Sequence, residues 1–171
     1  MTIDNAFLSS AVWLVLFPII FIIHFAEEYW CGGGYPAYLF RLRGVHLSTE
    51  RFLVGQLMGL IFFVASALIS TFLNFPEFMT AILGAFLLSN GISHSVTAIW
   101  DRHYGPGLIC SVLLWMPAGI LALLSMSAKI SLTHLLIALL IGFGINGLVA
   151  IATMSGARFR GSATTGSDLS R

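Results

Sequence analysis

Five long apolar runs, separated by short polar segments, make up most of this chain. Each run is about 20 residues long, which is the length an α-helix needs to cross the hydrocarbon core of a bilayer. Because the backbone inside a bilayer must satisfy its own hydrogen bonds, runs of this kind favour helices. We therefore predict an all-α membrane protein, a bundle of five transmembrane helices at residues 6–28, 52–73, 78–100, 108–126 and 132–154.

Two other segments do not fit the spanning pattern. Residues 35–45 contain Pro36 near their start and place Tyr38, Leu39 and Leu42 at helical spacing. That spacing indicates either a short interfacial helix lying on the membrane surface or an ordinary loop. Residues 156–171 are rich in Ser, Thr and Gly, which is typical of a disordered tail. We therefore expect a single transmembrane domain over residues 1–155, followed by this tail.

The composition excludes several classes of protein. Of the 171 residues, 58% are hydrophobic and only 9% are charged, whereas soluble domains have about 45–50% and 25%. A chain this short cannot hide so much apolar surface in one water-soluble core. The formal net charge of +1 also provides no basic surface for nucleic acid. The expected partner is the lipid bilayer, and no nucleic acid is expected.

The basic residues predict an orientation. With five spans, Lys129 is alone on one side, and the other side carries the remaining seven of eight basic residues: Arg41, Arg43, Arg51, Arg102, Arg158, Arg160 and Arg171. Cytoplasmic loops collect Lys and Arg. We therefore expect the N-terminus outside and the C-terminus in the cytoplasm. The first run lacks a positive segment before it, which argues against a cleaved signal peptide.

Charged groups inside a spanning helix are costly, which makes them functional candidates. His24, Glu27 and Glu28 close the first apolar run, and Glu27 and Glu28 lie three and four residues after His24. At this spacing all three side chains can converge on one patch of the helix. Two adjacent carboxylates repel each other in a low dielectric unless a proton or a metal ion neutralises them.

A second polar group lies on the third predicted span. Asn90, His94, Thr97 and Asp101 fall on one helical stripe, and His103 follows in the loop. The first and third spans run in the same direction across the membrane. Both polar groups therefore lie at a similar depth, near the end that we expect to face the cytoplasm.

Imidazole nitrogens and carboxylate oxygens suit zinc, iron or manganese. We interpret His24, Glu27, Glu28 and His94 as candidate ligands of a divalent metal. Among these four, Glu27, Glu28 and His94 are also the candidate catalytic groups. Such a metal could activate water or polarise an oxygen of a lipid or another apolar small molecule.

Other polar residues receive lesser roles. Asn90 could orient the ring of His94, and Asp101 and His103 are further candidate cofactor-binding residues. Gln56 and Asn146 are interpreted as packing contacts between helices. Gly55 and Gly59 form a Gly-x-x-x-Gly pair, which favours close packing within the chain or within a homo-oligomer.

The His-Phe-Ala-Glu-Glu stretch at residues 24–28 resembles the motif of a bacterial family, the HXXEE-motif membrane proteins. The stretch from Asn90 to His94 resembles the second polar block of that family. The resemblance implies a multi-span helical bundle in a bacterial inner membrane and singles out the same residues. It implies no particular substrate or reaction, because that family has no assigned activity.

Three hypotheses of function remain open on the sequence. The first is a metal-dependent membrane enzyme that acts on a lipid or another apolar small molecule. The second keeps the same residues without a metal, as an acid–base isomerase or a proton-coupled transporter of a small solute. The third is a non-catalytic subunit of a membrane complex, in which the polar cluster holds helices together or binds a lipid headgroup.

Overall fold

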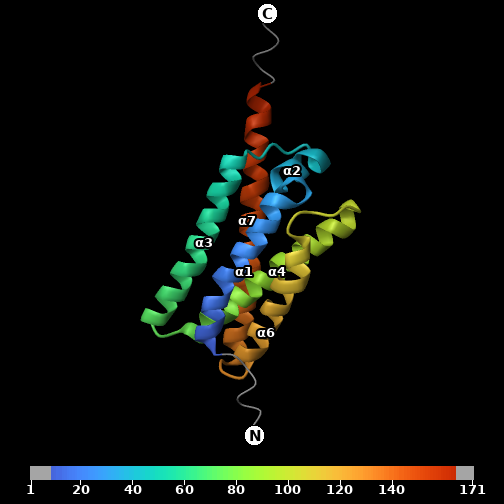
Figure 1. Ribbon diagram of the computed structural model, residues 1–171. Coiled ribbons are helices and arrows are strands. Elements are labelled where there is room, and N and C mark those ends of the chain that lie inside the picture. The colour runs from blue at the N-terminus through green and yellow to red at the C-terminus, as the bar shows by residue number, and fades with distance from the viewer. Residues whose placement is uncertain (1–8, 165–171) are drawn as a thin grey trace, which may run out of the picture.

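The structure of the chain is a computed structural model that describes residues 9–164, with side chains described up to residue 154 (Figure 1). The described part is helical and contains no strand. Its elements are α1 (Ser10–Trp30), η2 (Cys31–Gly33), α2 (Tyr35–Arg43), α3 (Thr49–Phe72), α4 (Pro76–Asp101), α5 (Leu108–Cys110), η3 (Ser111–Trp115), α6 (Met116–Ser127) and α7 (Leu132–Thr164).

Five helices in the described part are long and apolar enough to cross a membrane, which confirms the predicted number. They are Ser10–Gly33, Thr49–Phe72, Pro76–Asp101, Leu108–Ser127 and Leu132–Met154. Each begins and ends within a few residues of the expected bounds. The part of the chain that the structure describes is therefore all-helical, with five span-capable helices.

The helices begin where the sequence supplies suitable residues. The Ser9 hydroxyl accepts a hydrogen bond from the backbone N–H of Val12 at the start of α1. Ser48 does the same for Arg51 at the start of α3. Pro76 stands in the first turn of α4, where a missing N–H costs nothing. These local signals set the boundaries of the spans, and packing of their apolar faces holds them together.

The fourth span is not a uniform α-helix. It begins as α5, continues as the π-helical turn η3, and becomes α6 at Met116. Pro117 is the second residue of α6, just after this turn, and has no N–H to donate to the preceding turn. A wider π turn is one way for a helix to accommodate such a position. The irregular turn of the fourth span therefore lies just before Pro117.

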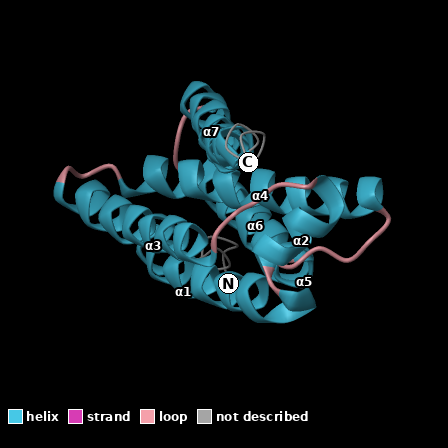
Figure 2. Ribbon diagram, turned by 90° about the horizontal axis from the view of Figure 1, so that it is seen from above, coloured by secondary structure: helices cyan, strands magenta, loops and turns pink. Residues whose placement is uncertain are grey.

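Helix α4 is the central element of the bundle. It packs against α6 and α7 along most of its length and also against α1 and α3 (Figure 2). Contact with α6 is backbone to backbone: a Cβ on Gly119 would lie 2.6 Å from the carbonyl oxygen of Gly84. Small residues allow this approach, as in other membrane helix pairs. Because α4 also touches α1, side chains of the first and third spans can meet.

The Gly-x-x-x-Gly pair of α3 divides into two roles. A Cβ on Gly59 would lie 2.7 Å from the ring of Phe21, so Gly59 packs against α1 within the same chain. No atom outside the local backbone lies within 4 Å of the position that a Cβ on Gly55 would take. The close packing expected within the chain therefore holds at Gly59 only.

The segment after α1 forms the short helix α2, Tyr35–Arg43. Of the two alternatives for residues 35–45, the structure therefore shows the helix and not the loop. Gly32, Gly33 and Gly34 all have positive φ, which lets the chain turn sharply between α1 and α2. At its other end α2 stops at Gly44, in the left-handed conformation.

Helix α7 continues beyond the apolar run to Thr164. The expected disordered tail began at residue 156, so its first part is helical instead. Residues 165–171 of that expected tail lie outside the described residues.

Candidate functional site

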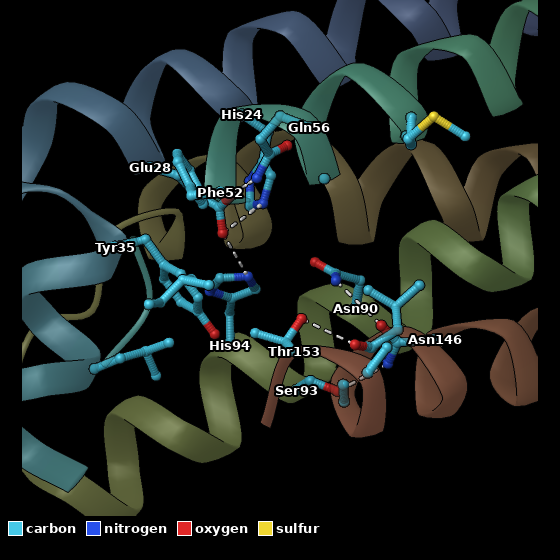
Figure 3. A pocket seen from close by; sticks show the side chains of 18 of the residues that line it. His24, Glu28, Tyr35, Phe52, Gln56, Asn90, Ser93, His94, Asn146 and Thr153 are labelled. Carbon is cyan, nitrogen blue, oxygen red and sulfur yellow. Dashed lines mark hydrogen bonds and ion pairs between the residues drawn. The ribbon is translucent and has the colours of Figure 1, made fainter. Parts of the chain in front are cut away.

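Three side chains converge at the junction of α1 and α4. The Nε2 atoms of His24 and His94 lie 3.6 Å and 3.4 Å from the same oxygen, Oε1 of Glu28 (Figure 3). One potential ligand atom from each of the three residues lies within 4.8 Å of the other two. His24 and Glu28 are only 2% and 6% exposed. This is the largest concentration of buried ionisable groups suited to a metal in the described part of the chain.

The helical spacing explains how α1 presents two of these groups. His24 and Glu28 are four residues apart and therefore share one face of the helix. The ring of His24 also lies 4.2 Å from the ring of Trp115, centroid to centroid, and meets the His94 ring edge-on at 5.0 Å. These contacts fix the ring of His24 between η3 and α4, so a third span packs against a cluster that two spans supply.

Gly107 closes the cluster from the loop that precedes α5. A Cβ at this position would lie 2.8 Å from Cε1 of His24, 2.9 Å from Cε1 of His94 and 3.0 Å from Cγ of Glu28. Its φ of +90° is also one that other residues rarely adopt. Only glycine therefore fits this backbone against the three candidate ligands.

Gln56 supports Glu28 from α3. Its side-chain amide donates a 2.6 Å hydrogen bond to Oε2 of Glu28, the oxygen that the histidines do not approach. Gln56 therefore holds the carboxylate so that Oε1 points between the two rings. This is the kind of hydrogen bond that orients a metal ligand.

Tyr35 covers the cluster from α2. Its ring lies 6.2 Å from that of His94 and stacks on that of Phe52 at 6.1 Å. Burial and the nearby charge of Glu28 raise the pKa of Tyr35. Tyr35 therefore stays a neutral phenol beside the three ionisable groups.

Glu27 does not join this cluster, although it is adjacent to Glu28 in the sequence. Its Oε1 accepts hydrogen bonds from the Tyr104 hydroxyl at 2.6 Å and the Ile109 N–H at 2.9 Å, and its Oε2 accepts one from the Cys110 N–H at 2.6 Å. Burial, together with the hydrogen bond to Glu27, raises the pKa of Tyr104. Glu27 thus ties α1 to the start of the fourth span, a different task from the ligand role expected of it.

The reason is geometric. Successive residues of an α-helix point about 100° apart, because 3.6 residues complete one turn. Glu28 is in line with His24, whereas Glu27 faces the first turn of α5. There it meets backbone N–H groups that have no partner within their own helix.

Asn90 is one turn from His94, but it bonds to α7 rather than to the His94 ring. Its Nδ2 donates to Oδ1 of Asn146 at 3.1 Å, and Nδ2 of Asn146 donates to the Ser93 hydroxyl at 3.0 Å. Ser93 in turn donates to the backbone carbonyl of Ser89. The expected packing role of Asn146 fits this arrangement, while Asn90 joins the two helices and lines the same cavity as His94.

Asp101 and His103 lie apart from the cluster of three. Asp101 accepts a 2.7 Å hydrogen bond from the Tyr38 hydroxyl and pairs with Arg43 at 3.1 Å. Burial and the bond to Asp101 raise the pKa of Tyr38 to about 12. His103 is exposed and bonds to the carbonyl of Asp101. Asp101 therefore fastens α2 to the end of α4, and the structure brings neither Asp101 nor His103 to the expected cofactor site.

A cavity of about 690 Å³ lies beside the cluster. Its walls come from α1, α2, α3, α4 and α7, and its lining includes His24, Glu28 and His94. Most known small-molecule pockets have volumes of about 300–1,000 Å³. The three ionisable groups are therefore next to a space that can hold a ligand.

The fold and this site define a class: a small all-helical protein, suited to a membrane, with a buried His–Glu–His cluster. Comparison with protein families matches residues 15–122 to a family described as "Protein of unknown function with HXXEE motif". The match covers more than half of the chain, so the protein belongs to this HXXEE family. No curated protein and no solved structure matches.

Sequence reasoning missed two parts of the site. Gln56 was interpreted as a packing residue, although its position near one end of the second span already matched the depth of His24. Gly107 was not singled out at all. A glycine between a proline and an apolar run carries no signal of which side chains press against it.

Proposed function

We propose that this protein is a membrane enzyme that binds one divalent metal through His24, Glu28 and His94 and acts on a lipid or another apolar small molecule. The observation that carries the proposal is the convergence of three potential ligand atoms within 4.8 Å, beside a cavity. Buried charged groups inside a spanning bundle are costly, and function is the usual reason for keeping them.

The donor set fits a metal that performs chemistry. Two imidazoles and one carboxylate are a ligand set found in catalytic zinc and non-haem iron sites, and they leave positions open for water or substrate. Such a metal would polarise a carbonyl or phosphoryl oxygen, or activate water. Gln56 would hold the carboxylate in place, while Tyr35, Phe52 and Trp115 would limit access of water.

Metal content tests this proposal. We expect protein purified in detergent without chelators to contain about one zinc, iron or manganese ion per chain. The variants His24→Ala, Glu28→Gln and His94→Ala should each lose most of it, because each removes one of three ligands. The measurement is elemental analysis by mass spectrometry on the monodisperse protein.

His103→Ala is the matched control, because His103 is exposed and lies outside the cluster. It should keep the metal content of the wild type. Wild-type protein that neither contains a metal nor binds added Zn²⁺, Fe²⁺ or Mn²⁺ would refute the proposal.

A metal-free version uses the same residues as an acid–base pair. The contacts of Glu28 with His24 and His94 support it, since a carboxylate between two imidazoles can pass a proton to a substrate. This version covers an isomerase and a proton-coupled transporter. Proton-dependent uptake of a small solute into proteoliposomes would favour the transporter.

A role as a non-catalytic subunit is the third candidate. It is supported by the many apolar side chains that the bundle leaves exposed, such as Leu57, Ile99 and Leu140. These side chains also fit contact with lipid. Co-purification of a partner in fixed proportion would favour the subunit role.

We further propose that the N-terminus faces outward and that the end carrying α2 faces the cytoplasm of a bacterial inner membrane. The support is the excess of arginines at that end. Cys31 is exposed there, whereas Cys110 is buried. A membrane-impermeant maleimide should therefore label Cys31 only after the cells are broken.

The control places a cysteine at the opposite end. In a Cys31→Ser background, Lys129→Cys should be labelled in intact cells. Labelling of Cys31 in intact cells, with Lys129→Cys protected, would reverse the orientation.

A further inference from the structure

The cavity beside the cluster is polar at one end and apolar at the other. Its polar part holds His24, Glu28, Gln56 and His94, together with polar side chains of α4 and α7: Asn90, Ser93, Thr97, Asn146 and Thr153. Further along α3 it is lined by aromatic and aliphatic side chains: Met58, Phe62, Phe63, Phe86 and Ile145. A ligand that fills the whole space must therefore carry a polar group at one end and an apolar chain at the other.

The cavity is open on the side between α3 and α7. These two helices are not among the element pairs that pack together in the described part of the chain, and Figure 2 shows them on opposite sides of α4. Val54 and Met58 of α3 and Val149 of α7 line the cavity and are still about half exposed, at 55%, 59% and 48%. In a membrane this side would face the acyl chains of the bilayer.

Gly55 keeps the space beside the cluster open. It lines the cavity one residue before Gln56, and no atom outside the local backbone lies within 4 Å of where its Cβ would be. Glycine in the interior of a helix costs about 1 kcal/mol relative to alanine. No packing contact of Gly55 offsets that cost, in contrast to Gly59, which meets the Phe21 ring.

We propose that the cavity binds a single-chain amphiphile, which enters sideways from the bilayer between α3 and α7 and lays its chain past Gly55. A volume of about 690 Å³ suits one small ligand rather than a two-chain phospholipid. The polar head then lies at His24, Glu28 and His94, and the chain extends toward Phe62 and Phe86. This inference rests on the proposed function in one respect: it names the class of molecule on which the His24, Glu28 and His94 site would act.

Photolabelling tests the chain-binding site directly. The probe is a 16-carbon fatty alcohol with a diazirine in the middle of its chain, added to the full-length protein in phosphatidylcholine liposomes. After illumination, mass spectrometry locates the adducts. We expect adducts concentrated on cavity residues such as Met58 and Ile145, above the level at Leu136 and Leu140, which are exposed but lie outside the cavity.

Two variants give the decisive comparison. Gly55→Phe, whose Cβ meets no neighbour, places a ring at the cavity wall and should lower cavity labelling about tenfold. Gly147→Phe on α7 also has open space but does not line the cavity, so labelling should stay at the wild-type level. Excess unlabelled hexadecanol should compete for labelling, and hexadecane should not, because it has no polar head.

Labelling spread evenly over lipid-facing residues, or labelling unaffected by Gly55→Phe, would overturn the inference. The same measurement on chelator-treated protein separates this inference from the metal proposal. If metal-free protein is labelled in the cavity and Gly55→Phe lowers that labelling, the amphiphile-binding proposal is supported even if the metal proposal fails. If the protein contains metal but shows no such labelling, only the amphiphile-binding proposal is overturned.

Discussion

Gly107→Ala should abolish the His–Glu–His site while leaving the helices in place. The new methyl group would lie within 2.8–3.0 Å of His24, His94 and Glu28, closer than carbon atoms can approach without movement. All three candidate ligands would have to shift, and a shift of about 1 Å is enough to spoil a metal site. We expect metal affinity to fall at least about a hundredfold.

Gly44→Ala is the matched control for backbone strain. Gly44 also has a positive φ, +62°, but no atom lies within 4 Å of where its Cβ would be. Both variants should lose about 1–2 kcal/mol of stability from the left-handed backbone, and only Gly107→Ala should lose the metal.

The effect on the site is also measurable without a metal. NMR signals of the His24 and His94 rings should move in Gly107→Ala and stay in Gly44→Ala. Unchanged ring signals and full metal content in Gly107→Ala would show that Gly107 does not shape the cluster.

The number of helices follows from the sequence because the membrane imposes a length on every apolar run. The meeting of His24 with His94 was also predictable, since equal depth in the first and third spans allows contact once those spans pack together. That packing depends on α4 being central. Gly84 and Gly91 of α4 and Gly119 of α6 permit it, because they let α4 approach the fourth span closely. No sequence pattern assigns these glycines their partners.

The division of labour between Glu27 and Glu28 marks the limit of sequence reasoning. Both lie within reach of His24 along α1, so spacing alone assigns both to one site. The partner on each side decides the outcome: Gln56 and His94 face Glu28, and the start of α5 faces Glu27. Tertiary contacts, which no local sequence pattern shows, therefore make Glu28 a candidate metal ligand and Glu27 a structural hydrogen-bond acceptor.

The different contacts of Glu27 and Glu28 link the two polar networks at the end of α1. The candidate metal cluster uses one face of the helix, and the attachment of the fourth span uses the neighbouring face. Because the two faces share the last turn of α1, the Glu27 contacts hold Gly107 and α5 close to His24 and Glu28. The structural acceptor thus supports the geometry of the site without touching it.

Glu27→Ala should be the most destabilising single substitution considered for this protein. It removes the acceptor of three hydrogen bonds and leaves the N–H groups of Ile109 and Cys110 and the Tyr104 hydroxyl without that partner. Each buried donor left unsatisfied costs about 1–3 kcal/mol. We expect a total loss of about 3–5 kcal/mol, seen as a fall of about 10 °C in the Tm of the detergent-solubilised protein.

Two variants divide this effect and separate Glu27 from Glu28. Tyr104→Phe removes only one of the three hydrogen bonds and should cost about 1 kcal/mol. Glu27→Gln keeps one acceptor oxygen, so it should fold with reduced stability and still bind metal, whereas Glu28→Gln should lose the metal at nearly wild-type Tm. Loss of metal in folded Glu27→Gln, with retention in Glu28→Gln, would reverse the assignment, because the carboxylate that binds metal would then be the one that faces α5.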